Sequence, residues 1–139
     1  DMGQQQLIAL LFNNLADVHL RMDEFAEAKQ YLHNGITMAR QIGAVPHVLT
    51  GMQTAGLLLG REGHLERGLA LIGLSLHHPS NTPETRRTAQ DCLRNLGLDA
   101  EDTAVQSALA QGETLDLDTV AEQLLAEWGG GEMRSEGMG

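Results

Sequence analysis

Apolar residues recur every three or four positions through most of the first 78 residues, which is the spacing of an amphipathic helix. The best-formed stretch, 11–42, spans the junction of two such segments, which run over about 4–22 and 24–42. Asp23 and Glu24 at the junction supply a turn and a favourable negative charge at the start of the second segment. We therefore predict a helical hairpin.

The first predicted helix carries two apolar stripes. A lone surface helix needs only one, so two stripes predict packing on two sides, against a hairpin partner and a neighbouring hairpin. The stripes are Ile8, Phe12, Leu15 and His19 on one side, and Leu7, Leu11, Val18 and Met22 on the other.

A second pair of helix-period segments follows over about 45–78. Pro46 suits a first helical turn, 61–64 reads as the turn between the segments, and 79–83 is a helix breaker with a proline at each end. A shift of 40 residues places small residues on small and large apolar residues on large. It aligns Ala16 with Gly56, Phe25 with Leu65, Ala28 with Gly68, Leu32 with Ile72, Gly35 with Ser75 and Ile36 with Leu76. This self-similarity predicts a repeat of two-helix units.

The C-terminal third predicts three more helices and a tail. Asn81 or Thr82 can cap a fifth helix, and 99–112 and 116–128 have helical spacing. We expect the fifth and sixth helices to form a degenerate third hairpin and the seventh to cap the open end of the stack. The glycine-rich residues 129–139 lack apolar periodicity and are predicted to be disordered.

The repeated residues resemble the tetratricopeptide repeat. The first unit matches its pattern at Phe12, Leu15, Ala16, His19, Ala28, Leu32 and Gly35, and the second at Met52, Ala55, Gly56, Leu59, Gly68, Ile72 and Ser75. The period of about 40 exceeds the family's usual 34 and resembles the subclass with extended second helices, found in kinesin light chains and many bacterial regulators.

The expected fold is therefore all-α. The resemblance implies an α-solenoid of antiparallel helix hairpins, forming a right-handed superhelix with a C-terminal capping helix. We expect one domain over 1–128, with hairpins at about 4–42, 45–78 and 82–112 and the capping helix at 116–128.

A second resemblance covers 107–125. This run is similar to the ending of large bacterial regulators that join a signalling ATPase core to tetratricopeptide repeats, including those with LuxR-type DNA-binding or cyclase domains. It implies that the chain is a C-terminal fragment of a larger cytoplasmic regulatory protein.

The cysteine count, the apolar runs and the net charge limit the expected cellular location and the classes of partner. A single cysteine excludes an internal disulfide, and neither a signal-peptide pattern nor a membrane-length apolar run occurs, so a cytoplasmic location is expected without membrane association. Of the net charge of −10, residues 99–139 contribute −9, from ten acids and one base. Such a field repels phosphate backbones, so we expect no nucleic-acid binding by this segment.

The sequence contains no convincing catalytic constellation. His77 and His78 form the only adjacent histidine pair, and their place at a helix C-terminus favours electrostatic capping over metal binding. Cys92 lies on an apolar helical face and is expected to be a buried structural thiol. Asp116 suits the N-cap of the last helix. We therefore expect no enzymatic activity, no metal and no cofactor.

The better functional candidates are residues that a tetratricopeptide groove would expose from its first helices. Asn and Gln side chains there can hydrogen-bond the main chain of an extended peptide. The residues are Asn13, Asp17 and Leu20 in the first unit, and Gln53 and Leu57 in the second. They could equally be solvated, or covered by another domain of the same chain.

These patterns favour a protein-protein interaction module, acting as scaffold or sensor. Its partner would be a protein or peptide segment, or another domain of the parent chain. Two alternatives stay open: a helical domain associated with DNA binding in a transcriptional regulator, and a small metal-dependent hydrolase built on His77 and His78.

Overall fold

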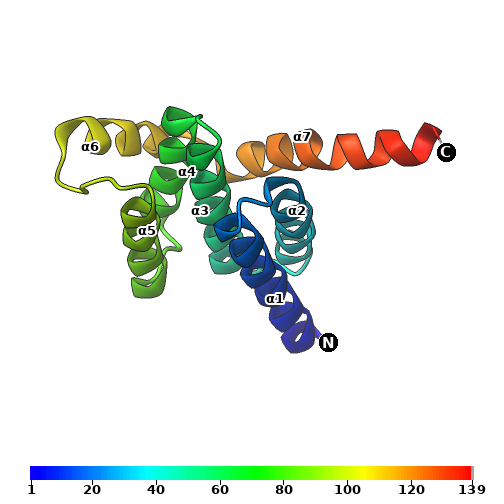
Figure 1. Ribbon diagram of the computed structural model, residues 1–139. Coiled ribbons are helices and arrows are strands. Elements are labelled where there is room, and N and C mark those ends of the chain that lie inside the picture. The colour runs from blue at the N-terminus through cyan, green and yellow to red at the C-terminus, as the bar shows by residue number, and fades with distance from the viewer. Residues whose placement is uncertain (139) are drawn as a thin grey trace.

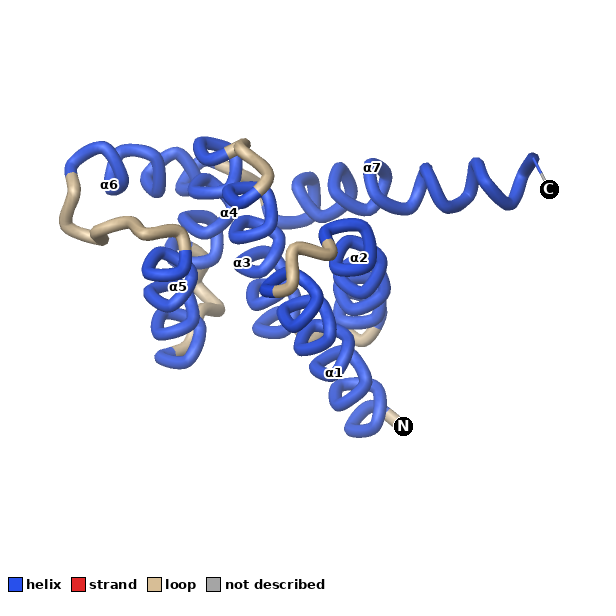
Figure 2. Tube along the Cα trace, in the orientation of Figure 1, coloured by secondary structure: helices blue, strands red, loops and turns tan. Residues whose placement is uncertain are grey.

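The computed structural model describes the backbone of residues 1–138 and the side chains of residues 1–129. Over this range it contains helices and turns but no strand, so the protein is all-α, as predicted (Figures 1 and 2). The elements are α1 (Met2–Arg21), α2 (Phe25–Gln41), α3 (Val45–Arg61), α4 (Leu65–His77), α5 (Pro83–Asn95), α6 (Thr103–Ala110), the short 3-10 helix η1 (Gln111–Thr114) and α7 (Leu117–Met138). None of the helices in the described range is long and apolar enough to cross a membrane.

Four helices end in the same type of turn, in which the residue after the C-cap adopts a left-handed conformation. The next backbone N–H then donates back to the last helical turn, as in Glu24 N to His19 O and His64 N to Leu59 O, both at 2.8 Å. Three of the left-handed residues are glycines, and Asp23, with φ of 60°, is the exception. The turns after α1 and α3 reverse the chain and create the first two predicted hairpins, and the turn after α2 joins them.

The first hairpin packs α1 against α2 through small residues. Ala16 and Ala28 are completely buried, and a Cβ added at Gly35 would lie 3.1 Å from that of Phe12. The predicted face of α2 is confirmed, with Leu32 and Ile36 also in the core. On α1, one predicted stripe packs through Phe12 and His19 against Tyr31, whereas the other faces outward.

The second hairpin brings the backbones of α3 and α4 into contact. A Cβ added at Gly56 would lie 2.5 Å from the carbonyl oxygen of Gly68, and one at Gly68 would meet the carbonyl oxygen of Gly56. Because α3 also contacts α1, α2 and α5, nearly all of its middle turns are buried. The protein is thus organised around α3.

The predicted third hairpin is wrong. α5 packs on α3, whereas α6 and η1 pack on α4, and an extended loop over 96–102 separates α5 from α6 (Figure 2). Two glycines allow α6 and η1 to pack on α4. A Cβ at Gly73 would collide with the backbone of Leu109, and one at Gly112 with the backbone of α4. Only glycine at both places allows this approach.

The predicted position of the last helix is also corrected. α7 does not cap the end beyond α5 and α6. It runs back toward the first hairpin and packs on α2 (Figure 1). Its apolar face is the predicted one, with Val120 and Leu124 buried. Arg67 of α4 forms a bidentate ion pair with Glu127 of α7. Gly129 of α7 lies so close to His33 of α2 that an added Cβ would touch the imidazole. The predicted helix end at 128 and the predicted disorder over 129–139 are not what the described backbone shows, because α7 continues to Met138; residue 139 lies outside the described residues.

Replacement of Gly56 by alanine should lower the free energy of unfolding by about 2 kcal/mol or more, since overpacking of a tight contact costs roughly 1–3 kcal/mol. The added methyl group would press on the Gly68 carbonyl, a backbone atom that cannot rotate away. Urea unfolding followed by circular dichroism measures the loss.

Gly3→Ala is the matched control. Its new methyl group would be 3.5 Å from the nearest atom, an ordinary contact, so helix propensity alone should stabilise the protein by about 0.5–1 kcal/mol. Equal effects of the two substitutions would contradict the proposed backbone contact.

Candidate functional site

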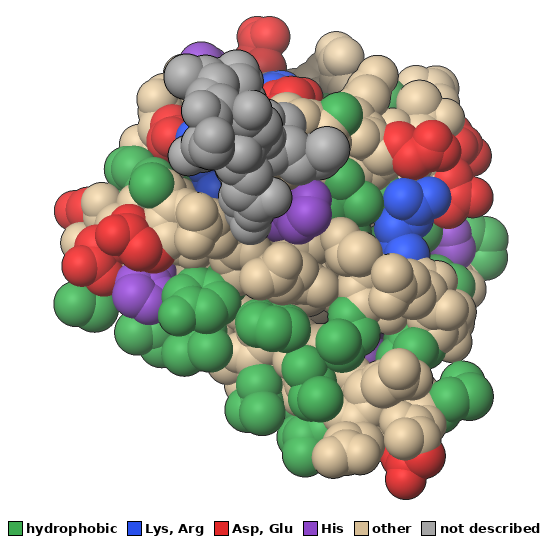
Figure 3. All heavy atoms as spheres, turned by 90° about the vertical axis from the view of Figure 1, so that its right-hand side faces the viewer, with side chains coloured by type: hydrophobic (Ala, Val, Ile, Leu, Met, Phe, Trp, Pro, Cys, Tyr) green, Lys and Arg blue, Asp and Glu red, His purple; other side chains and the backbone are tan. Residues whose placement is uncertain are grey.

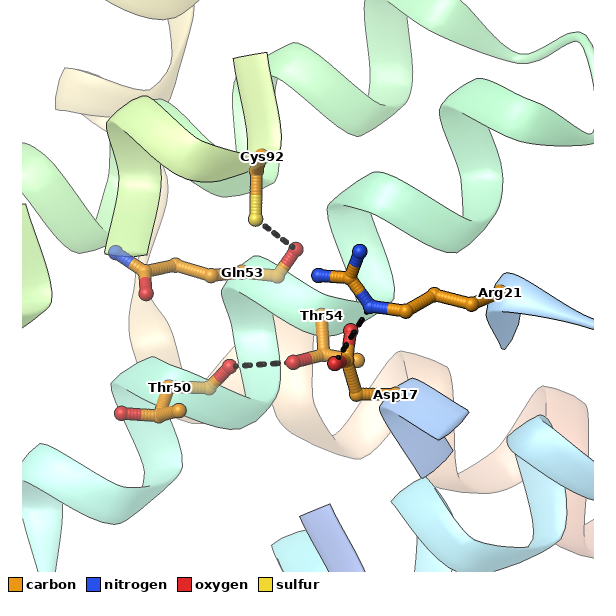
Figure 4. Close-up of polar contacts among 6 residues, drawn as sticks. All are labelled: Asp17, Arg21, Thr50, Gln53, Thr54 and Cys92. Atoms are coloured by element: carbon orange, nitrogen blue, oxygen red, sulfur yellow. Dashed lines mark hydrogen bonds and ion pairs between the residues drawn. The ribbon is translucent and has the colours of Figure 1, made fainter. Parts of the chain in front are cut away.

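A polar groove lies across α1, α3 and α5. We call it the α1–α3–α5 groove, and it encloses about 230 Å³. It is lined by Leu10, Asn13, Asn14, Asp17 and Arg21 of α1, Thr50, Thr54 and Leu57 of α3, and Glu84, Thr88, Asp91 and Cys92 of α5. Figure 4 shows how part of its floor is assembled, with Asp17 and Arg21 approaching Thr54 and Cys92.

The groove is acidic and rich in hydrogen-bond acceptors. Its lining contains three carboxylates, from Asp17, Glu84 and Asp91, and one guanidinium, that of Arg21. Arg21 Nε donates to Asp17 Oδ2 at 2.9 Å, and this bond raises the pKa of Arg21 further above its ordinary value. The side-chain oxygen of Asn13 is shielded from solvent and has no hydrogen-bond partner among the described residues. Asp17 is paired with Arg21 and Asp91 with Arg94, so Glu84 is the groove carboxylate without an ion pair among the described residues.

Three of the five predicted site residues meet in this groove. Asn13 and Asp17 are half-buried along its wall, whereas Leu57, only 2% exposed, lies beneath its floor as part of the hydrophobic core and offers a partner almost no surface. Leu20 and Gln53 are both fully buried, so the prediction that they face a partner is wrong. Leu20 instead belongs to the hydrophobic core.

Gln53 is a structural tie between three helices. Its Nε2 donates to Ser75 Oγ of α4 at 2.9 Å and to the Thr85 carbonyl of α5 at 2.7 Å. Ser75 in turn donates to the carbonyl of Ile72 at 2.6 Å. A buried amide with these bonds fixes the start of α5 against the second hairpin, which positions the α5 wall of the groove.

α5 contributes one wall of the groove, which was not among the predicted site residues. Glu84, Thr88 and Asp91 recur at positions i, i+4 and i+7, which places them on one face of the helix. That polar stripe was visible in the sequence, but only the contact of α5 with α3 turns it toward Asp17.

Cys92 is buried at the edge of the groove, as predicted. Its Sγ lies 3.8 Å from the backbone carbonyl of Gln53, to which the thiol donates. Burial, and then the charges of Asp17 and Asp91, raise the pKa of the thiol to about 12. Such a thiol stays protonated near neutral pH and is a poor nucleophile.

A second hollow lies where α7 crosses α2 and α3. It encloses about 450 Å³ and is lined mainly by apolar groups, among them Val45, Val48, Leu117 and Leu125. Arg40 at its rim is 3.8 Å from Asp118 and 4.0 Å from Glu122. Thr37 also lines this hollow, and its buried Oγ1 has no hydrogen-bond partner among the described residues, but most of the lining is apolar.

The histidine pair engages in local hydrogen bonds. His77 Nδ1 is 2.8 Å from the Gly73 carbonyl, and His78 Nδ1 accepts from the backbone N–H of Ser80 at 3.0 Å. Among the described residues, no three His, Cys, Asp or Glu side chains converge as a metal site would require. Asp116 accepts from the backbone and side chain of Thr119, and these bonds lower its pKa, in agreement with its predicted role as a cap.

Comparisons with family models, with curated proteins and with solved structures gave no match. The class that the structure defines is an all-helical protein with two stacked hairpins and an acidic groove across its first, third and fifth helices.

Gln53→Met should lower the free energy of unfolding by about 1–3 kcal/mol, because it keeps the side-chain volume but leaves the Thr85 carbonyl without its donor. Urea denaturation provides the measurement. Gln30→Met, at an exposed position of α2, makes the same chemical change and should alter stability by less than about 0.5 kcal/mol. A neutral Gln53→Met would show that the tie is dispensable.

Cys92 in the folded protein should react with iodoacetamide at pH 8 at least about a hundredfold more slowly than in urea, since the thiolate is the reactive form. The raised pKa also predicts a loss of stability in alkali, as the thiol ionises in the unfolded chain first. That contribution is complete below about pH 8.5 and declines as the pH rises toward 12.

Unfolding of the wild type and of Cys92→Ala at pH 7.5 and pH 10 isolates this contribution. The wild type should lose more stability between the two values than the variant. Equal losses, or fast labelling of the folded protein, would disprove the burial of the thiol.

Proposed function

We propose that this protein is a non-enzymatic interaction module of the tetratricopeptide type that binds an extended, basic peptide segment in the α1–α3–α5 groove. The observation that carries the proposal is the acidic lining of the groove, which contains three carboxylates and one guanidinium. Asp17 and Asp91 pair with Arg21 and Arg94, and Glu84 has no ion pair among the described residues. Lysine and arginine side chains and main-chain N–H groups are the donors that such a surface accepts.

The packing order supports the repeat-type arrangement. α1 pairs with α2 and α3 with α4, while the first helices α1, α3 and α5 follow one another in contact. The two completely buried alanines of the first hairpin, Ala16 and Ala28, occupy the positions of Gly56 and Gly68 in the second. A stack of this kind presents its first helices on one surface, which suits recognition of an extended segment.

We further propose that the module serves as scaffold or sensor in a larger cytoplasmic regulatory protein. The similarity of 107–125 to the ends of bacterial ATPase-type regulators supports this proposal. Other domains of such a chain are then candidate sources of the bound segment.

The alternative of DNA binding has less support. Most basic side chains already face a carboxylate within 4.0 Å, which removes them from the pool available to phosphates. They are Arg21, Lys29, Arg40, Arg61, Arg67 and Arg94. The metal-dependent hydrolase has no supporting observation beyond the histidine pair itself.

Binding of fluorescent nine-residue peptides tests the proposal. A glycine-serine peptide with three lysines should bind and raise the fluorescence anisotropy, whereas the peptide with three glutamates should not. Glu84→Gln/Asp91→Asn should weaken binding of the lysine peptide by about 5- to 20-fold, the effect of losing two partly exposed ion pairs.

Glu101→Gln/Glu113→Gln removes the same charge from exposed positions outside the groove and should change the affinity by less than about twofold. If both double variants weaken binding equally, the attraction is a general effect of net charge. If neither peptide binds, the groove does not have the proposed role.

A further inference from the structure

The outer face of α1 is exposed and strongly apolar. Most of the large exposed hydrophobic side chains in the described part of the chain lie on this helix. Four of them and Met22, the residue that caps the helix, form a continuous stripe, with Leu7 at 55% exposure, Leu11 at 50%, Leu15 at 42%, Val18 at 51% and Met22 at 61%. Figure 3 shows hydrophobic side chains gathered over the lower part of the molecule, where Figure 1 places the N-terminal half of α1. Contiguous apolar stripes of this kind mark interaction surfaces.

The stripe has the spacing of a coiled-coil seam. With the half-buried Ile8, four of these residues follow the alternating steps of three and four that bring a seam against another helix. The seam residues are Ile8, Leu11, Leu15, Val18 and Met22. No charged residue occurs in α1 before Asp17, and Asp17 is paired with Arg21 on the groove side.

The face of α3 that corresponds to the outer face of α1 is buried in the second hairpin. After the shift of 40 residues, Leu11 corresponds to Gly51, which lies so close to Ile36 that a Cβ would come within 2.7 Å of it. The equivalents of Leu15 and Val18, Ala55 and Leu58, are completely buried. The same face is therefore a packing surface in α3, where it contacts the preceding hairpin.

The side chains on α1 are too large for that mode of packing. A helix like α2 approaches α3 closely because residue 51 is glycine and residue 55 is alanine. Leucines at 11 and 15 hold a neighbouring helix farther away, at the distance of a leucine-rich seam. A second α1 supplies a seam of matching size and spacing.

We propose that the outer face of α1 binds the same face of a second copy of this chain, forming a two-fold dimer through an antiparallel pair of α1 helices. In this arrangement Leu11 lies opposite Leu15 of the second copy, and Ile8 opposite Val18. Asp17 and Arg21 of each copy then lie level with the uncharged residues Ala9 and Gln5 of the other, whereas Asp1 comes level with the start of α2 of the second copy, near Glu24.

The size of the face sets the expected strength. Five side chains that are each 42–61% exposed form a face smaller than the ~800 Å² that each partner buries in a standard interface, so a weak dimer is expected. The proposal does not depend on the groove, because peptide binding and dimer formation use different faces of α1.

Sedimentation velocity of the full chain tests the proposal, from about 1 μM to about 500 μM, a range that brackets the affinity of a small interface. The sedimenting mass should rise from one copy to two and then stop. Leu11→Lys/Val18→Lys should weaken the dimer at least about a hundredfold, because the seam cannot bury two ammonium groups. Leu11→Ala/Val18→Ala, which keeps the helix uncharged, should weaken it by about tenfold or more.

Leu65→Lys/Leu115→Lys is the control, since both leucines are exposed hydrophobic residues outside α1. It should dimerise like the wild type, and circular dichroism of every variant should match that of the parent. A single-copy mass throughout the range would show that another partner covers the stripe. A mass growing beyond two copies would show head-to-tail association. A dimer unaffected by both α1 variants would form elsewhere, and each of these results overturns the proposal.

Discussion

The backbone contact between Gly56 and Gly68 is the constraint on which the rest of the structure depends. It draws α4 close to α3, so that Ser75 reaches Gln53 and the Gln53 amide can also reach the start of α5. α5 then completes the groove. A second close approach, at Gly73 and Gly112, sets η1 and the end of α6 on the opposite side of α4. The glycines at these two close approaches thus determine where α5, α6 and η1 pack.

α1 shows how one helix serves several surfaces. Ala9, Ala16 and Leu20 are buried within the protein, Asn13 and Asp17 line the groove, and Leu11 and Val18 belong to the outer stripe. The three sets lie at different angles around the helix axis, and the groove set adjoins the stripe along Leu10 and Asn14. A protein bound to the stripe would therefore lie beside the mouth of the groove.

Local pattern explains what the sequence could predict. The first four helices, their turns and the small residues at 16, 28, 56 and 68 follow from periodicity and from a shift of 40 residues, both properties of neighbouring positions. The placement of α5, α6 and α7 depends on contacts between distant residues, such as Arg67 with Glu127 and His33 with Gly129. No local pattern indicates these. The same limit explains Gln53, whose side chain resembles a groove residue until its bonds to residues 22 and 32 positions away are known. Asn13 and Asp17 were predictable because their helix position alone directs them to the groove.

The return of α7 to α2 changes how the protein should unfold. Stacked hairpins that contact only their neighbours can fray from one end, since each unit contributes its own share of stability. Here the last helix packs on the second, so detaching the first hairpin also removes the surface that holds α7. The ends of the chain are energetically coupled, and amide hydrogen exchange in α2 and in the first turns of α7 should report the same opening event.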